Sequence, residues 1–101
     1  MREITLNGSL WKNRNDVYDA FFAAVGAPSW HGRNFDAWND SIATGGINEV
    51  EVPYGIVIRN YNLIGAGAKD FVEDFIDLIQ QIRERGCQVE IKIDAPRRER
   101  A

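Results

Sequence analysis

One stretch of the sequence, AKDFVEDFIDLIQQIRER over residues 68–85, limits the possible folds more than any other. Its large apolar side chains recur at helical spacing and are Phe71, Val72, Phe75, Ile76, Leu78, Ile79 and Ile82. This period predicts an amphipathic helix that buries one face in a core. Acids lie early in the segment and arginines late, with Gly86 after them, as the helix dipole and a glycine stop favour. The chain must therefore pack one side of a long helix.

Shorter patterns in the rest of the chain alternate between strand and helix. Strands are predicted at residues 3–6, 54–59 and 88–93, and helices at residues 16–25 and from Asn34 to a point before Gly45. Asn15 is the predicted cap of the first helix. Ile56, Val57 and Ile58 in succession indicate a central strand covered on both sides. The last strand alternates apolar and charged residues, so one of its faces should be exposed to solvent.

This alternation predicts the fold class. Strands joined through helices make right-handed crossovers, which imply a parallel three-stranded sheet. If all helices lie on one face, the strand order is 1-2-3 and the α/β fold has two layers. With 101 residues, 45% of them hydrophobic, the chain fits one domain over residues 1–94. The remaining APRRERA, residues 95–101, is predicted to be a disordered basic tail.

The distribution of apolar residues and cysteine indicates where such a protein would act. The first ten residues, MREITLNGSL, lack a signal-peptide core, and nowhere do about 18 apolar residues run together. The one cysteine, Cys87, cannot close an internal disulfide and agrees with a reducing compartment. We therefore expect a cytoplasmic protein without membrane contact.

The charge is uneven along the chain although the net charge is only −3. Residues 15–58 hold six acids and a single base, Arg33. Phosphate binding needs clustered lysines and arginines, so direct contact with nucleic acid is disfavoured. An acidic body instead favours a basic protein partner.

Two acids, Asp36 and Asp40, lie four residues apart on the predicted second helix. At the α-helical rotation they are about 40° apart, and they face away from the core side marked by Trp38, Ile42 and Phe35. Like charges at this spacing cost a helix roughly 0.2–0.5 kcal/mol. Either the two acids belong to a solvated helix face, or they form a paired anionic contact for a cationic partner.

The loop before these acids contains Trp30, His31 and Gly32. Aromatic residues in such loops often anchor interfaces, so Trp30 could contact a partner. The alternative is that its ring folds onto the core beneath the loop. His31 is expected to be an ordinary surface histidine.

Two short motifs carry a resemblance to a known family. The first is HGRNFDAWND, in which Gly32, Asn34, Asp36, Ala37 and Asp40 follow Pro28 and an aromatic residue. The second is RERGCQVEIKI, which leads from the long helix into the last strand. The chain resembles, over nearly its whole length, the barstar family of intracellular ribonuclease inhibitors. That resemblance implies a parallel three-stranded sheet with helices, and no cofactor.

The resemblance also implies a binding mode. In that family the loop and second helix plug the substrate cleft of a ribonuclease, and acids stand in for RNA phosphates. Asp36 and Asp40 match the inhibitory aspartates, and Asp40 matches the one that enters the phosphate-binding centre. The other implied partner-binding residues are Trp30, Gly32, Asn34, Phe35 and Asn39.

Several residues depart from the family pattern. Asn39 replaces a tryptophan, glycines replace another just beyond the helix, and Gln81 replaces an acid on the long helix. Arg33 places a positive charge in the loop, which would oppose docking to a basic cleft unless it reaches an acid on the partner's rim.

We expect an inhibitor of antitoxin or immunity type, bacterial and monomeric when free, that occludes the cationic active site of a secreted or toxin ribonuclease. The alternative is a module of the same fold for a different basic partner, without nuclease inhibition. Enzymatic activity is not expected, because His31 with Asp36, and Cys87, make a poor catalytic set. No metal is expected, since two carboxylates alone make a weak site. GAGAKD lacks the third glycine of a dinucleotide loop.

Overall fold

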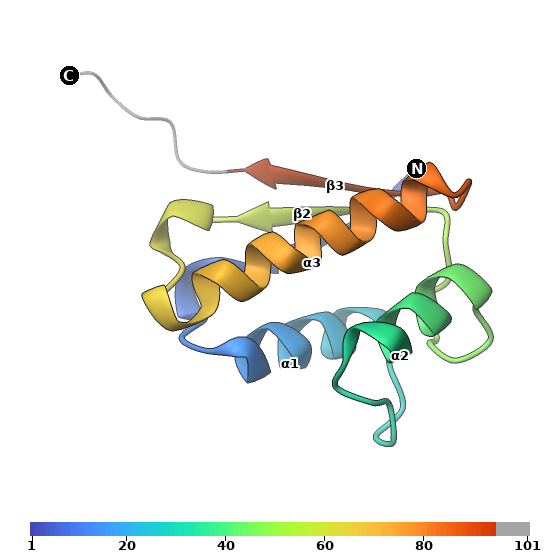
Figure 1. Ribbon diagram of the computed structural model, residues 1–101, viewed down its shortest axis with the longest axis horizontal. Coiled ribbons are helices and arrows are strands. Elements are labelled where there is room, and N and C mark those ends of the chain that lie inside the picture. The colour runs from blue at the N-terminus through green and yellow to red at the C-terminus, as the bar shows by residue number, and fades with distance from the viewer. Residues whose placement is uncertain (95–101) are drawn as a thin grey trace.

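The computed structural model describes residues 1–94 (Figure 1). The strands are β1 (Arg2–Asn7), β2 (Tyr54–Arg59) and β3 (Val89–Asp94). The helices are α1 (Arg14–Val25), α2 (Phe35–Asn39), the π-helix η2 (Asp40–Thr44) and α3 (Ala66–Glu84). Single 3-10 turns, η1 (Gly8–Leu10) and η3 (Tyr61–Leu63), follow β1 and β2. The tail predicted at residues 95–101 lies outside the described residues, and the domain boundary at residue 94 stays a prediction.

The three strands form one parallel sheet in the order β1-β2-β3, as predicted. In its register Ile4, Ile56 and Ile91 lie side by side across the sheet. Alternate residues of each strand point toward the helices, which gives β1 its pattern of buried Ile4 and Leu6 between exposed neighbours. α1 packs beside β1 and α3 beside β3. Figure 1 shows α3 running along the strands.

The central strand β2 is buried on both faces, but the two faces are covered differently. Ile56 and Ile58 are fully buried in the core beneath the helices. Val57, on the opposite face, is also buried. Lys92 of β3 and Glu3 of β1 form an ion pair with a 3.6 Å N···O distance, joining the strands on either side of β2. Neighbouring side chains, rather than a second helical layer, therefore cover Val57.

Helix α3 matches the predicted amphipathic segment but begins two residues earlier, at Ala66. Gly65 is its N-cap, and the helix ends before Gly86, whose φ of 103° favours glycine. A Cβ at Gly67 would lie 2.5 Å from the carbonyl oxygen of Lys12. The glycines of GAGAKD thus permit close packing against the chain that follows η1. No helix within residues 1–94 is long and apolar enough to cross a membrane.

The predicted cap of α1 was wrong. Asn13, not Asn15, is the N-cap, and its side-chain oxygen accepts a hydrogen bond from the Asp16 backbone N–H at 3.2 Å. Asp16 in turn accepts one from the Lys12 N–H at 2.7 Å. This reciprocal arrangement satisfies two backbone donors and favours the earlier of the two asparagines. Asn15 is left inside the first turn with its side chain free for another contact.

Trp38 of α2 lies at the centre of the helical layer and is fully buried. Its ring stacks on Tyr18 of α1 with centroids 4.3 Å apart and lies 4.5 Å from the ring of Phe75 in α3. Phe21 meets it edge-on at 5.6 Å. This aromatic cluster holds the short helix α2 against both long helices, so the residues on its outer side are presented from a rigid base.

Candidate functional site

The site predicted from the sequence is built on the loop at residues 26–34 and the helix that follows. The Asn34 side chain accepts a hydrogen bond from the Ala37 N–H at 2.7 Å, so the predicted helix start is confirmed. Beyond Asn39 the helix widens, and the Gly45 N–H bonds to the Asp40 carbonyl five residues back at 3.0 Å. The helical segment ends before Gly45, as predicted.

Asp36 and Asp40 are both exposed, while Trp38 between them is fully buried. The prediction that the two acids face away from the core is confirmed. Neither carboxylate forms an ion pair or accepts a hydrogen bond from any residue in the described part of the chain. The helix therefore presents two negative charges that nothing in residues 1–94 neutralises by direct contact.

Trp30 lies in a turn of the loop with 72% of its surface exposed. The alternative in which its ring folds onto the core is wrong. A large apolar ring held in water gains free energy when a partner covers it. Trp30 thus has the exposure that an interface anchor requires.

His31, expected at the surface, is instead buried. Its Nδ1 lies 2.8 Å from the Gly32 carbonyl oxygen, which assigns a proton to that nitrogen. Its ring lies 4.5 Å from the ring of Phe22 in α1, measured between centroids. The loop folds back onto α1, a contact that residue type alone does not reveal. His31 helps to shape the loop from beneath.

Gly32 lies in a narrow space between the loop and α2. A Cβ at this position would stand 3.1 Å from the Ala37 Cβ and 3.1 Å from the Asn34 side-chain nitrogen. Both neighbours belong to the first turn of the helix. Gly32 therefore lets the loop approach the capped helix start closely, and its role is steric.

Phe35 and Asn39 are predicted contact residues that the structure ties to α3. The Phe35 ring is partly buried, 5.4 Å from Phe71 and 5.7 Å from Trp38 between centroids. The Asn39 side-chain oxygen accepts a hydrogen bond from Arg85 at 3.1 Å. The outward-facing set of predicted residues is thus Trp30, Asn34, Asp36 and Asp40, all of which are exposed.

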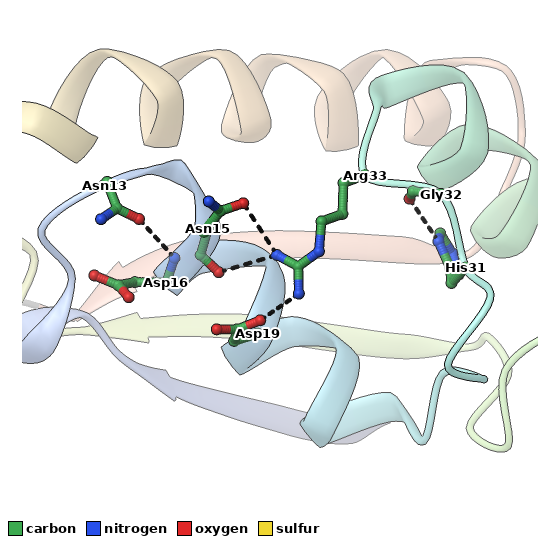
Figure 2. Close-up of polar contacts among 7 residues, drawn as sticks. All are labelled: Asn13, Asn15, Asp16, Asp19, His31, Gly32 and Arg33. Atoms are coloured by element: carbon green, nitrogen blue, oxygen red, sulfur yellow. Dashed lines mark hydrogen bonds and ion pairs between the residues drawn. The ribbon is translucent and has the colours of Figure 1, made fainter.

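Arg33, considered from the sequence as a cation that could oppose docking, is turned toward α1 (Figure 2). Its guanidinium forms an ion pair with Asp19 and donates to the Asn15 side-chain oxygen at 3.2 Å. It also lies over the rings of Tyr18 and Phe22, 5.7 Å and 5.6 Å from their centroids. The acid that Arg33 reaches belongs to its own chain.

A groove of about 520 Å³ lies beside Asn34 and Phe35. Its other lining residues come from α1, the loop and α3: Arg14, Tyr18, Arg33, Gly67, Asp70, Phe71 and Asp74. The sequence interpretation missed this feature. The available signal was the pair Asp70 and Asp74, four residues apart, which flank Phe71 at the margin of the apolar stripe of α3.

The residues considered for catalysis are not assembled into a reactive group. The His31 Nδ1 is paired with the Gly32 carbonyl, so Asp36 does not orient the ring. Burial raises the pKa of the Cys87 thiol above its ordinary value of 9.0, which favours the unreactive thiol over the thiolate. Among residues 1–94, no group of three or more His, Cys, Asp and Glu side chains could hold a metal ion.

A family model described as Barstar (barnase inhibitor) matches residues 1–95. The chain belongs to the barstar family. A relative within the curated proteins is "Putative ribonuclease inhibitor YrdF" of Bacillus subtilis (strain 168), 27% identical over 84 residues. That alignment covers 83% of this chain and 88% of the relative. The resemblance inferred from the two motifs is thereby confirmed.

Barstar-family membership agrees with the architecture, since the parallel sheet in order 1-2-3 with its helices is the fold that the resemblance implied. It also gives the exposed loop and acidic helix a context. Trp30, Asp36 and Asp40 stand on one continuous segment between α1 and β2 of a barstar-family protein. Their roles as contact residues stay a prediction.

Proposed function

We propose that this barstar-family protein inhibits a microbial ribonuclease by inserting its acidic helix into the cationic active site of the enzyme. Family membership and the name of the Bacillus subtilis relative support a ribonuclease-inhibitor-like role. The observation that carries the finer proposal is the pair Asp36 and Asp40, exposed and without a cationic partner in the described chain. The protein would act as an antitoxin or immunity protein in the bacterial cytoplasm.

The physical argument begins with the carboxylates. Each one gains strong charge-assisted hydrogen bonds when an arginine or lysine reaches it in a water-poor interface. The two carboxylates repel each other in the free helix, but a basic cleft attracts both of them. Because the buried Trp38 already holds α2 in place, binding has to fix the side-chain rotamers of the two acids but not the backbone of the helix.

The neighbouring exposed residues complete the surface. Trp30 supplies apolar area from the loop, and Asn34 lies at the helix start beside Asp36. Interface hot spots, the few residues that supply most of the binding energy, commonly combine an aromatic anchor with charges that are desolvated on binding. We propose that these residues contact the nuclease directly and that the protein itself catalyses no reaction.

The test is calorimetric titration against a panel of secreted microbial ribonucleases, with RNA cleavage followed in parallel. The double variant Asp36→Asn, Asp40→Asn keeps the side-chain shape and removes both charges. Binding should weaken by at least about a hundredfold, because even one cation left buried without its anion costs about 3 kcal/mol. RNA cleavage should return in the same variant.

The matched control is Glu84→Gln with Glu90→Gln. Both residues are exposed, and both line the surface depression where α3 leads into β3. This control changes the net charge by the same amount as the test variant. If it weakens binding equally, the effect comes from overall charge and the acidic helix is not the contact.

A second candidate function is favoured by Asn39. Its side chain is engaged by Arg85, at a position where the resemblance implied a tryptophan directed at the nuclease. The same surface could therefore serve a different basic partner. Tight binding without loss of RNA cleavage, abolished by the Asp36 and Asp40 substitutions, would support this second function over inhibition.

A further inference from the structure

Arg33 connects the predicted binding loop to α1 through several different contacts (Figure 2). Besides its ion pair with Asp19, it reaches both the side-chain and backbone oxygens of Asn15, at 3.2 Å and 3.4 Å. Figure 2 shows the arginine side chain leaving the loop and extending toward α1. A planar guanidinium can serve two acceptors at once, which an ammonium does less well.

The flat face of the Arg33 guanidinium also lies against aromatic rings of α1. Arg33 lies 5.6 Å from the centroid of Phe22, and His31 of the same loop lies 4.5 Å from that ring. Phe22 thus receives two side chains from the loop. Burial raises the pKa of the neighbouring Tyr18 phenol, although Arg14 and Arg33 act to lower it. The contacts come from one turn after another of α1, so they hold both the position and the direction of the loop.

The same contacts decide where the positive charge of Arg33 lies. Asp19 faces it from α1, while Asp36 and Asp40 stand on the following helix. Within residues 1–94 the ion pair with Asp19 is the contact that neutralises this cation. Arg33 therefore leaves Asp36 and Asp40 without an ion pair in the described part of the chain, although it lies only three residues before Asp36 in the sequence.

We propose that Arg33 is a positioning residue for partner binding. It holds residues 26–34 on α1 in the conformation that presents Trp30 and Asn34, and it keeps its own charge away from the partner's cationic site. The proposal rests on the proposed function for its binding readout. It also predicts a property of the free protein, the stability of the loop, that does not depend on any partner.

The loop offers a suitable probe for that property. The His31 N–H donates to the Pro28 carbonyl at 3.0 Å, inside the segment that Arg33 holds. When the loop detaches from α1, this amide should exchange with solvent faster. Hydrogen exchange of the His31 amide by NMR therefore reports local opening without a ligand.

The variants are Arg33→Gln, Arg33→Lys, Asp19→Asn and the double variant Arg33→Gln, Asp19→Asn. Arg14→Gln is the control, since it removes an arginine from the start of α1 that lies over Phe71 instead of the loop rings. In Arg33→Gln the His31 amide should exchange about two- to fivefold faster, the range expected for loss of one exposed ion pair. In Arg33→Lys the exchange rate should lie between those of the wild type and Arg33→Gln. Lysine keeps the positive charge for Asp19 but lacks the planar set of N–H donors of a guanidinium.

Binding should follow the same order for a nuclease that the wild type binds. Arg33→Gln should weaken binding by at most about two- to fivefold, the same factor as the rise in loop opening, because the partner must now supply that ordering. Arg33→Gln should matter less in the Asp19→Asn background than in the wild type, which is the sign of coupling between the two residues. Arg14→Gln should leave both binding and exchange near their wild-type values.

Two results would overturn the proposal. One is tighter binding by Arg33→Gln, which would mean that the arginine faces the partner and repels it. The other is unchanged exchange of the His31 amide in Arg33→Gln. If no ribonuclease binds the wild type, the proposed function fails, and the exchange measurement on the free protein alone still supports or overturns the positioning role.

Discussion

Trp38 stacks on Tyr18 with a centroid separation of 4.3 Å, and this contact joins the acidic helix to α1. The two aromatic residues belong to segments separated by the loop at residues 26–34. Their packing lets a five-residue helix, too short to be stable alone, serve as a rigid support. Substitution of Trp38 should therefore affect both stability and binding, whereas substitution of the exposed residues should affect binding alone.

Replacing Trp38 with alanine should lower the free energy of unfolding by about 3–5 kcal/mol, since it removes a fully buried ring and leaves a cavity. Urea unfolding followed by circular dichroism measures the change. Trp11→Phe, at another buried tryptophan outside the cluster around Tyr18, is a milder comparison. A loss below about 1 kcal/mol for Trp38→Ala would contradict the central role of this ring.

Trp30→Ala should have the opposite profile. Its ring is 72% exposed, so the free energy of unfolding should change by less than about 0.5 kcal/mol. Binding to a responsive ribonuclease should weaken at least about tenfold if the ring is an interface anchor. Calorimetric titration beside urea unfolding separates the two effects. Leu10→Ala, at a residue that is 75% exposed, controls for loss of apolar surface elsewhere.

Partner binding should weaken as salt is added, because screening acts on the exposed carboxylates of Asp36 and Asp40. The association rate, measured by stopped flow, should fall severalfold between about 0.05 M and about 0.5 M salt. The Asp36→Asn, Asp40→Asn variant should show a flatter dependence. Equal slopes for wild type and variant would place the steering charge elsewhere.

Stability should fall in alkaline solution through Tyr54 and Cys87. Burial raises the pKa of the Tyr54 phenol above its ordinary 10.0, and that of the Cys87 thiol above 9.0. The folded state therefore binds more protons than the unfolded state at high pH. The stabilising contribution is complete below about pH 9 and is lost as the pH rises toward the folded-state pKa values. Urea unfolding from pH 7 to pH 11 measures this loss.

Tyr54→Phe isolates one part of that dependence. The Tyr54 hydroxyl is buried and has no hydrogen-bond partner among residues 1–94. Its removal should leave stability at pH 7 unchanged or raise it by about 1 kcal/mol, since an unpaired buried hydroxyl is destabilising. The decline above pH 10 should become shallower. Tyr61→Phe is the contrasting variant, because its hydroxyl donates to Glu73 at 3.0 Å.

Much of the fold follows from local patterns. The stripe from Phe71 to Ile82 predicted α3, and the apolar run at Ile56, Val57 and Ile58 predicted the central strand. Right-handed crossovers then implied a parallel sheet, and the further condition that all helices lie on one face gave the order 1-2-3. The outward direction of Asp36 and Asp40 was predictable in the same way, because it depends only on the rotation of a helix whose apolar side is recognisable.

Local sequence patterns were enough to predict the order of the elements, the start of α2 at Asn34 and the separation of its acidic and buried sides. They could not predict that Asn13 rather than Asn15 caps α1, that His31 is buried, or that Arg33 pairs with Asp19. The difference lies in the range of the interactions. Periodicity and capping act within one segment, whereas these side chains are placed by packing between segments that meet only when the chain has folded.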